Sequence, residues 1–206
     1  STKVVGESKD AGNYTAYVEF VNDIDKLNYT ISNIFQEYTI SAKVINAVWG
    51  NSTLVYNDKD QSPKIIDFES NSLCEGDSLD LGKINYIGKQ INAGTGYTVT
   101  ITENFKNYDI SSSTSSCEFQ ITKAPLTIRV ENKEVEYDGG KFDDSFNVTA
   151  EGLLGNDTLS SVISQIYYGD EVANAQNADT YQIVLSAKQQ GVDYNNYTVT
   201  YEEGKT

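Results

Sequence analysis

The side chains best equipped for chemistry in this sequence are carboxylates. The chain carries 30 acidic residues against 15 basic ones and has no histidine. Asp58, Asp60 and Asp67 form one group along the sequence, and Asp77 and Asp80 form a second. Carboxylate oxygens are the hard ligands that Ca²⁺ prefers, but neither group has the spacing of a known calcium loop. We therefore favour solvated turns, keep calcium binding as a secondary hypothesis, and expect no other cofactor.

Catalysis has little support in the residue types. Without histidine, the Ser/His and Cys/His nucleophile systems and the commonest zinc ligand are excluded. Paired carboxylates could serve a glycosidase, yet so many acidic residues produce such pairs by chance. The sequence therefore predicts that the chain is not an enzyme.

A repeated stretch of sequence sets the positions of most other notable residues. It reads "DAGNYTAYVEF" at 10–20, "NAGTGYTVTIT" at 92–102 and "NADTYQIVLSA" at 177–187. We interpret its marked residues as structural, with a small residue taking turn angles that a β-branched residue could not, and a tyrosine filling the edge of the core. The turn residues are Gly12, Gly94 and Asp179, and the tyrosines are Tyr14, Tyr97 and Tyr181. A ligand-binding role for the tyrosines is the alternative.

An asparagine-tyrosine pair follows each stretch. The pairs are Asn28-Tyr29, Asn107-Tyr108 and Asn196-Tyr197. We expect each asparagine to hydrogen-bond its own turn and each tyrosine to pack. Asn-x-Thr sequons occur at Asn13, Asn28, Asn51, Asn147, Asn156 and Asn196. Several belong to the repeated pattern itself, so we favour a structural role over glycosylation.

The markers define a period of about 80 residues. The front half of the unit appears as "INAVWGNSTLVYND" at 45–58 and "LTIRVENKEVEYDG" at 126–139, then as "EGDSL" at 75–79 and "GNDTL" at 155–159. We predict three domains: the back half of a repeat at 1–43, a complete repeat at 44–124, and a repeat at 125–206 that lacks its last strand. We expect the end repeats to be completed by a segment outside this sequence or by a neighbouring copy.

Each unit is predicted to consist of β-strands. Residues 97–102 alternate apolar and polar side chains, as do 14–20 and 126–130, and Gly, Asn and Asp clusters separate the runs. In the first segment we expect strands at "TAYVEFV", "NYTISNI" and "EYTISAK". The sole predicted helical turn is "NDTLSSVIS", capped by Asn156 or Asp157. We therefore predict an all-β chain of tandem Ig-like β-sandwich modules, with a β-grasp-like module around this turn as the alternative.

The order of "ITKAPLTIRVENKEVEYDG", "EGLLGNDTL", "ADTYQIVLSA" and "NNYTVTYEEGKT" resembles the tandem MBG/YDG modules of large bacterial surface proteins and adhesins. The resemblance implies an extracellular, non-catalytic stalk or spacer at the cell surface. One alternative is an adhesive module, in which Trp49, Tyr167 and Tyr168 grip a host glycan or protein. Trp49 aligns with Val130, however, which favours core filling. The other alternative is a filament subunit that assembles by β-strand exchange.

Two cysteines, Cys74 and Cys117, occur in the middle repeat and nowhere else. Because the resemblance places the chain outside the cell, we predict a disulfide between them, with two free thiols as the alternative. The bridge would close a loop of about 43 residues and add about 3–4 kcal/mol in the chain-entropy model.

Net charge narrows the choice of partners. A formal charge of −15 opposes binding to nucleic acid or anionic lipid. No apolar run approaches the roughly 20 residues that span a bilayer. We therefore expect neighbouring repeats, in the same polypeptide or another copy, as the main partners.

Overall fold

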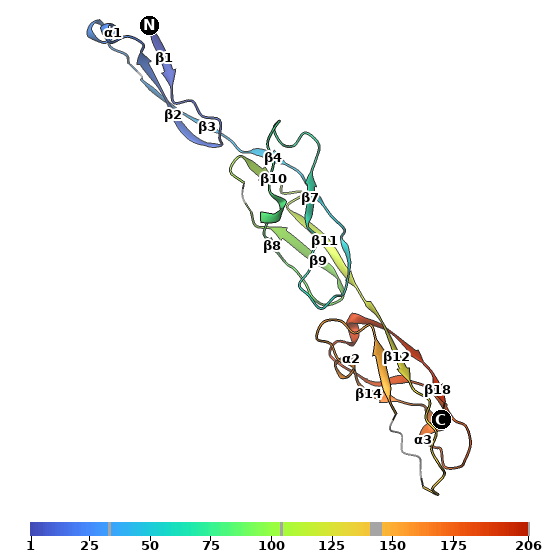
Figure 1. Ribbon diagram of the computed structural model, residues 1–206. Coiled ribbons are helices and arrows are strands. Elements are labelled where there is room, and N and C mark those ends of the chain that lie inside the picture. Colours follow the sequence, from blue (N-terminus) through green and yellow to red (C-terminus); the bar gives the residue numbers. More distant parts are fainter. Residues whose placement is uncertain (33, 104, 141–145, 206) are drawn as a thin grey trace. The chain divides into compact units, whose positions relative to one another are not determined.

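The computed structural model describes residues 1–32, 34–103, 105–140 and 146–205. Strands account for 42% of it and short helices for 10%, which confirms the predicted all-β class (Figure 1). Contacts divide the chain into two compact units. The first comprises Ser1–Gly50, Ile65–Ile87 and Thr100–Ser116, and the second comprises Asn51–Lys64, Gly88–Val99 and Cys117–Thr206.

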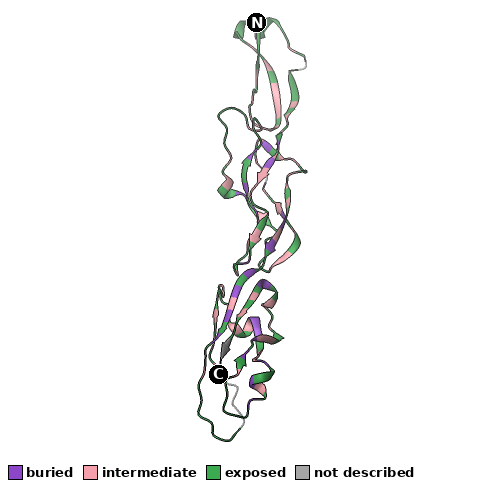
Figure 2. Cartoon of the chain, turned by 90° about the vertical axis from the view of Figure 1, so that its right-hand side faces the viewer, coloured by how far each residue is buried: buried purple, intermediate pink, exposed green. Residues whose placement is uncertain are grey.

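The N-terminal part of the first unit is a three-stranded antiparallel sheet. It consists of β1 (Thr2–Val5), β2 (Gly12–Phe20) and β3 (Phe35–Ile40), in the order β1-β2-β3. The short helix α1 (Asp23–Asn28) joins β2 to β3. The strand expected at "NYTISNI" (28–34) is wrong for the described residues, because Asn28 ends a helix whose first turn carries acidic residues and 29–32 and 34 form no strand. Asn33 lies outside the described residues. No described residue of 1–44 is buried (Figure 2).

The rest of the first unit surrounds a hydrophobic core. Strand β4 (Lys43–Ile45) runs parallel to β10 (Tyr108–Ile110), and β5 (Ala47–Trp49) runs antiparallel to β7 (Ile65–Phe68). After the 3₁₀ turn η1 (Leu81–Lys83), β8 (Tyr86–Ile87) pairs with the end of β9 (Gly94–Ile101). The core consists of Ile45, Ala47, Ile65, Phe68, Ile84 and Tyr108.

The second unit is built around one strongly buried strand. Strand β12 (Ala124–Val130) buries every second side chain, as a strand covered on one face should. It lies between β13 (Val148–Glu151), which is antiparallel to it, and β17 (Tyr197–Glu202), which is parallel. Strand β6 (Thr53–Val55) pairs in parallel with β11 (Ser116–Thr122), in a sheet of order β6-β11-β9-β8.

Short elements complete the second unit. Strands β14 (Ile163–Tyr167) and β16 (Ser186–Gln190) pair antiparallel, as do β15 (Gln182–Ile183) and β18 (Gly204–Lys205). The helices are α2 (Leu159–Val162), α3 (Asp170–Ala173) and the 3₁₀ turn η2 (Tyr194–Asn196).

The predicted helical turn exists as α2, but its cap is neither Asn156 nor Asp157. Thr158 accepts a hydrogen bond from the Ser161 backbone N–H, and the Ser161 side chain bonds back to the Thr158 backbone. This reciprocal capping box satisfies two N–H groups that a single aspartate or asparagine would not. Helices α1 and α3 were not predicted from the sequence.

Equivalent strands of 44–124 and 125–206 pair in the same register. The first strand of each segment runs parallel to the strand that begins with its Asn-Tyr tyrosine. Tyr108 lies opposite Lys43, and Tyr197 lies opposite Ala124. Both strand pairs thus start from the equivalent tyrosine of the repeated pattern. The domain boundaries proposed from the sequence stay a prediction.

The glycine that precedes each repeated stretch has a steric role. Gly6, Gly88 and Gly169 have φ values of 92°, 92° and 95°, which side-chain-bearing residues rarely adopt. At Gly88 a Cβ atom would lie 2.2 Å from the Thr98 carbonyl oxygen, and at Gly6 it would lie 2.5 Å from that of Thr15. The neighbouring strand therefore crosses Gly6 and Gly88 at backbone contact, whereas at Gly169 a Cβ atom would lie 3.4 Å from Val184 and only the φ value favours glycine.

Candidate functional site

Each repeated stretch begins with a turn of one aspartate or asparagine followed by alanine, which we call the Asx-Ala turn. The three turns are Asp10-Ala11, Asn92-Ala93 and Asn177-Ala178. The tyrosine hydroxyl that follows donates to a carbonyl of its own turn, from Tyr14 to Ala11 at 3.5 Å, from Tyr97 to Asn92 at 3.1 Å and from Tyr181 to Asn177 at 3.0 Å. These half-buried tyrosines therefore hold the turn closed.

The tyrosine ring also explains a glycine in the stretch. A Cβ atom at Gly94 would lie 2.3 Å from the Tyr97 hydroxyl, and one at Gly12 would lie 3.0 Å from that of Tyr14. At Gly94 the reason is this close approach rather than special backbone angles, since Gly96 carries the positive φ of 72°. In the third stretch, Asp179 accepts a hydrogen bond from the Thr180 N–H.

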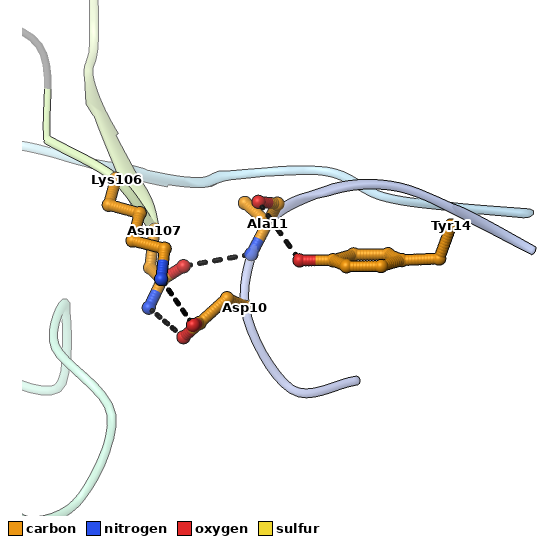
Figure 3. Close-up of polar contacts among 5 residues, drawn as sticks. All are labelled: Asp10, Ala11, Tyr14, Lys106 and Asn107. Carbon is orange, nitrogen blue, oxygen red and sulfur yellow. Dashed lines mark hydrogen bonds and ion pairs between the residues drawn. The ribbon is translucent and has the colours of Figure 1, made fainter. Parts of the chain in front are cut away.

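In the first unit, an asparagine from the next segment binds the Asx-Ala turn (Figure 3). The Asn107 side-chain oxygen accepts a hydrogen bond from the Ala11 N–H at 2.8 Å, and its amide donates to the Asp10 carboxylate at 3.0 Å. Lys106 forms an ion pair with the same carboxylate. Lys106 and then Asn107 hold the pKa of Asp10 below its ordinary value. The contact therefore recognises both the backbone and the side chain of the turn.

The second unit repeats this contact with different residues. The Asn196 side-chain oxygen accepts from the Ala93 N–H at 2.9 Å, and its amide donates to the Asn92 side chain at 3.1 Å. Asn196 is only 3% exposed, so both hydrogen bonds are sheltered from water. We call this arrangement the asparagine clasp, in which one asparagine binds the alanine N–H and the preceding Asx side chain.

A carboxylate bridges two tyrosines beside the second clasp. Asp157 accepts a hydrogen bond from Tyr56 at 2.8 Å and another from Tyr197 at 2.5 Å. The two rings pack edge-on with centroids 5.3 Å apart, and both tyrosines are buried. Burial, and then the hydrogen bond to Asp157, raise the pKa of each tyrosine well above its ordinary value. Both phenols therefore stay protonated as donors.

The loop that carries Asp157 is fixed by a second carboxylate. Asp58 accepts a hydrogen bond from the Asn156 N–H at 2.9 Å. Gly155 has φ of 56°, and a Cβ atom there would lie 1.9 Å from an Asp58 oxygen. Gly155, which has no side chain, thus lets the backbone of this loop contact Asp58. Two residues later, Asp157 is placed to accept the hydrogen bond from Tyr56.

The first unit contains a counterpart of the Tyr197 contacts. The Tyr108 hydroxyl donates to Asp77 at 2.5 Å and accepts from the Cys74 N–H at 2.9 Å. Tyr197 likewise donates to Asp157 and accepts from the Leu154 N–H at 3.0 Å. The hydrogen bond to Asp77 raises the pKa of Tyr108 to about 12. Cys74 and Leu154 therefore occupy the equivalent positions that the sequence predicts.

The expectation that the asparagines bond their own turns is wrong for Asn107 and Asn196. Each reaches a turn of the preceding segment, because the backbone N–H there is left unpaired by its own strand and needs an acceptor. Asn28 differs again, since its amide donates to the Ile24 carbonyl within α1. The sequence signal for the clasp was the recurrence of an Asn-Tyr pair after each repeated stretch.

Comparison with known families identifies the segment that supplies Asn196, Tyr197 and Asp157. Residues 126–206 match the profile of the MBG domain of YGX type. Residues 126–206 are therefore similar to MBG domains, and we call them the MBG-like segment. MBG domains are repeat modules of surface proteins and are not a known enzyme family. Neither the curated proteins nor the solved structures gave a significant match to the chain.

For residues 126–206 the match confirms the resemblance seen in the sequence, while the tandem arrangement stays a prediction. The MBG-like segment supplies Asn196, Tyr197 and Asp157, and their partners Ala93 and Tyr56 precede it in the chain. The second clasp is therefore a contact between the MBG-like segment and the residues before it.

Both cysteines are free thiols, so the predicted disulfide is absent from this structure. Cys74 is exposed in the turn bound by Tyr108. Cys117 is half-buried in β11, where its thiol donates to the Glu118 carbonyl, and burial raises its pKa. Each thiol thus has its own local environment.

Four carboxylates of the calcium hypothesis accept hydrogen bonds from the chain itself. Asp67 and Asp80 accept from nearby backbone N–H groups, those of Phe68 and Gly82. Asp77 and Asp58 accept from distant residues, Tyr108 and the Asn156 N–H. Within the ranges that the structure describes, no group of three or more metal-binding side chains comes together. In the same ranges no helix is long and apolar enough to cross a membrane.

The aromatic residues of the adhesive alternative are half-buried. Trp49 donates to the Thr114 carbonyl at 2.9 Å and packs against Tyr86, as a core residue does. Tyr167 donates to Asp170, and Tyr168 packs on Phe146. These contacts do not favour a glycan-stacking platform.

Proposed function

We propose that the chain is a non-catalytic spacer from the extracellular part of a cell-surface protein, built from tandem MBG-type repeats. The observation that carries this proposal is the recurrence of the asparagine clasp. Asn107 binds Ala11 in the first unit, and Asn196 binds Ala93 in the second, with the same atoms in the same roles. A contact that recurs at successive joints is what a repeating stalk requires.

The clasp supports a joint of restricted motion. The Asn196 side chain makes two hydrogen bonds of different kinds, accepting one from a backbone N–H and donating the other to a side-chain oxygen. Releasing it would leave Asn196 and the Ala93 N–H without partners in a site shielded from water, which costs about 1–3 kcal/mol per group. The tyrosine pair on Asp157 adds a second point of attachment, and two points together oppose rotation about either.

The net charge of −15 fits the same role. A strongly acidic surface keeps neighbouring chains apart and soluble, which suits a spacer crowded on a surface. The match to MBG domains, which occur in surface proteins, supports the extracellular location.

The test measures orientation across the second clasp. Residual dipolar couplings would be collected for backbone amides of 88–99 and 117–122 on one side and of 125–202 on the other. We expect one alignment tensor to fit both sets. In Asn196→Ala the two sets should require separate tensors.

Asn195→Ala is the matched control, because Asn195 is the exposed neighbour of the buried Asn196. It should keep the single tensor. Separate tensors in the unmodified chain would refute a spacer with fixed joints.

A further inference from the structure

The third Asx-Ala turn is formed in the same way as the other two but has no clasp. The Tyr181 hydroxyl closes it on the Asn177 carbonyl. Ala178 is exposed, whereas Ala11 and Ala93 are half-buried under their asparagines. Among the described residues, no hydrogen bond is recorded to the Ala178 N–H or to the Asn177 side chain, so the turn offers both groups that Asn107 and Asn196 bind elsewhere.

Tyr137 lies beside this turn, and it is the counterpart of the tyrosine that binds Asp157 in the second clasp. Tyr137 aligns with Tyr56, seven residues after the aligned pair Val130 and Trp49. Tyr56 is 2% exposed under Asp157, but Tyr137 is 61% exposed. The equivalent of the Asp157 contact is therefore available at Tyr137.

The Tyr137 ring and the third Asx-Ala turn share one surface. Tyr137, Asn177, Ala178 and Tyr181 line the same cavity of about 440 Å³. In the second clasp, the equivalent residues Tyr56, Asn92 and Ala93 are hydrogen-bonded by Asp157 and Asn196. The cavity thus corresponds to the place that the MBG-like segment takes on the segment before it.

We propose that this cavity is the docking site for a further MBG-type repeat joined to the chain, an inference that rests on the proposed function. The incoming repeat places the aspartate of its Gly-Asx-Asp loop on the Tyr137 hydroxyl. The asparagine of its Asn-Tyr pair accepts from the Ala178 N–H and donates to the Asn177 side chain. A partner without both residues lacks one of the two attachments.

The approach to the cavity fits a connecting strand. Leu54, at the middle of β6, lies opposite Ile121 in the parallel pair with β11. Its equivalent Val135 is 56% exposed and lines the cavity, and residues 131–138 form no strand. The polypeptide that leads to the docked repeat would pair here as Gln120–Thr122 pairs with β6.

The test extends the whole chain by a second copy of residues 118–206, fused after Thr206. This copy brings its own connecting strand, Gly-Asn-Asp loop and Asn-Tyr pair. Hydrogen exchange of the Ala178 amide would be measured by NMR in the original and the extended chains. We expect exchange to slow by about tenfold or more on extension, because the amide gains a sheltered hydrogen bond.

Variants confined to the appended copy identify the residue responsible. Asn196→Ala there should return Ala178 exchange to the rate of the original chain, while the rest of the appended copy keeps its protection. Asn195→Ala there is the matched control and should leave Ala178 protected.

Several outcomes would overturn the proposal. One is unchanged Ala178 exchange beside a folded appended copy, and another is an appended copy that stays unfolded, since docking should stabilise it. Slowing of Ala178 exchange as the original chain is concentrated would assign the site to a separate molecule instead. The dipolar couplings across the second clasp are independent of all three results, so failure of the spacer proposal is recognised separately.

Discussion

Asn196 accepts the backbone N–H of Ala93 at 2.9 Å, although 103 residues separate the two in the sequence. A hydrogen bond over such a separation is formed only when the MBG-like segment and the preceding segment are both folded. It therefore couples the stability of one to that of the other.

Replacing Asn196 by alanine should destabilise the chain by about 2–3 kcal/mol, because the Ala93 N–H loses its acceptor in a buried site. Urea unfolding followed by circular dichroism measures the change. The exposed neighbour variant Asn195→Ala should stay within about 0.5 kcal/mol of the unmodified chain. Equal losses in the two variants would contradict the clasp.

Replacing Tyr56 by phenylalanine should cost about 1–2 kcal/mol, because Asp157 loses one of its two phenol donors in a buried position. Tyr137→Phe is the matched control, since Tyr137 occupies the equivalent position but is exposed. It should change the unfolding free energy by less than about 0.5 kcal/mol. A similar cost at both positions would show that the Asp157 contact contributes nothing.

Alkaline pH should weaken the fold through three tyrosines. The pKa of Tyr108 is raised from 10.0 to about 12 by its hydrogen bond to Asp77, and those of Tyr56 and Tyr197 are raised by burial and by Asp157. When the pKa of a tyrosine is higher in the folded chain than in the unfolded chain, the protonated tyrosine stabilises the fold fully at pH values below the unfolded-state pKa. This contribution is lost as pH rises from the unfolded-state pKa through the folded-state pKa.

The free energy of unfolding should therefore fall as pH rises from 10.0 towards 12. Tyr197→Phe should be less stable at neutral pH but lose less over this range. Phenolate absorbance provides a second measurement, in which these tyrosines should ionise after the others. A fall of equal size in Tyr197→Phe and the unmodified chain would exclude Tyr197 as a source.

A side chain at Gly88 should be poorly tolerated. Gly88→Ala places Cβ 2.2 Å from the Thr98 carbonyl at a φ of 92°, so we expect a loss of about 3 kcal/mol. Gly76 has a similar φ of 84° with nothing within 4 Å of a Cβ atom. Gly76→Ala should therefore cost only about 1 kcal/mol, and thermal unfolding of the pair separates contact from backbone strain.

The two thiols should react at different rates in the folded chain. Cys74 is exposed, while Cys117 is half-buried with a raised pKa, and thiolate fraction and access govern alkylation. Mass spectrometry after brief iodoacetamide treatment should find Cys74 modified first. Unfolding in urea should remove the difference, and two unreactive sulfurs in the folded chain would indicate a disulfide instead.

Local pattern predicted the strands best where one face is covered. In β9, Val99 is buried and Tyr97 and Ile101 are half-buried, while Thr98 is exposed, as the alternation indicates. The short helices α1 and α3 escaped prediction because four to six residues hold too few turns for a helical period to appear. Of the helices α1, α2 and α3, only α2 has a side-chain cap, from Thr158.

The candidate site was only partly readable in the sequence. The recurrence of Asn107 and Asn196 marked them as structural, but their partners lie about a hundred residues away, and nothing in either local sequence names the acceptor turn. Asp157 was noted as a turn residue, and its second tyrosine, Tyr56, comes from another segment. Contacts between segments depend on tertiary structure, which the recurrence of residues along the sequence does not specify.

The middle segment, 44–124, carries both halves of the clasp. Its Asn107 binds the turn before it, and its Asn92-Ala93 turn is bound by the domain after it. A unit with complementary ends can be duplicated or deleted whole without creating a mismatched joint. The length of the spacer that we propose can therefore change in steps of one repeat, with no new interface to be evolved at each step.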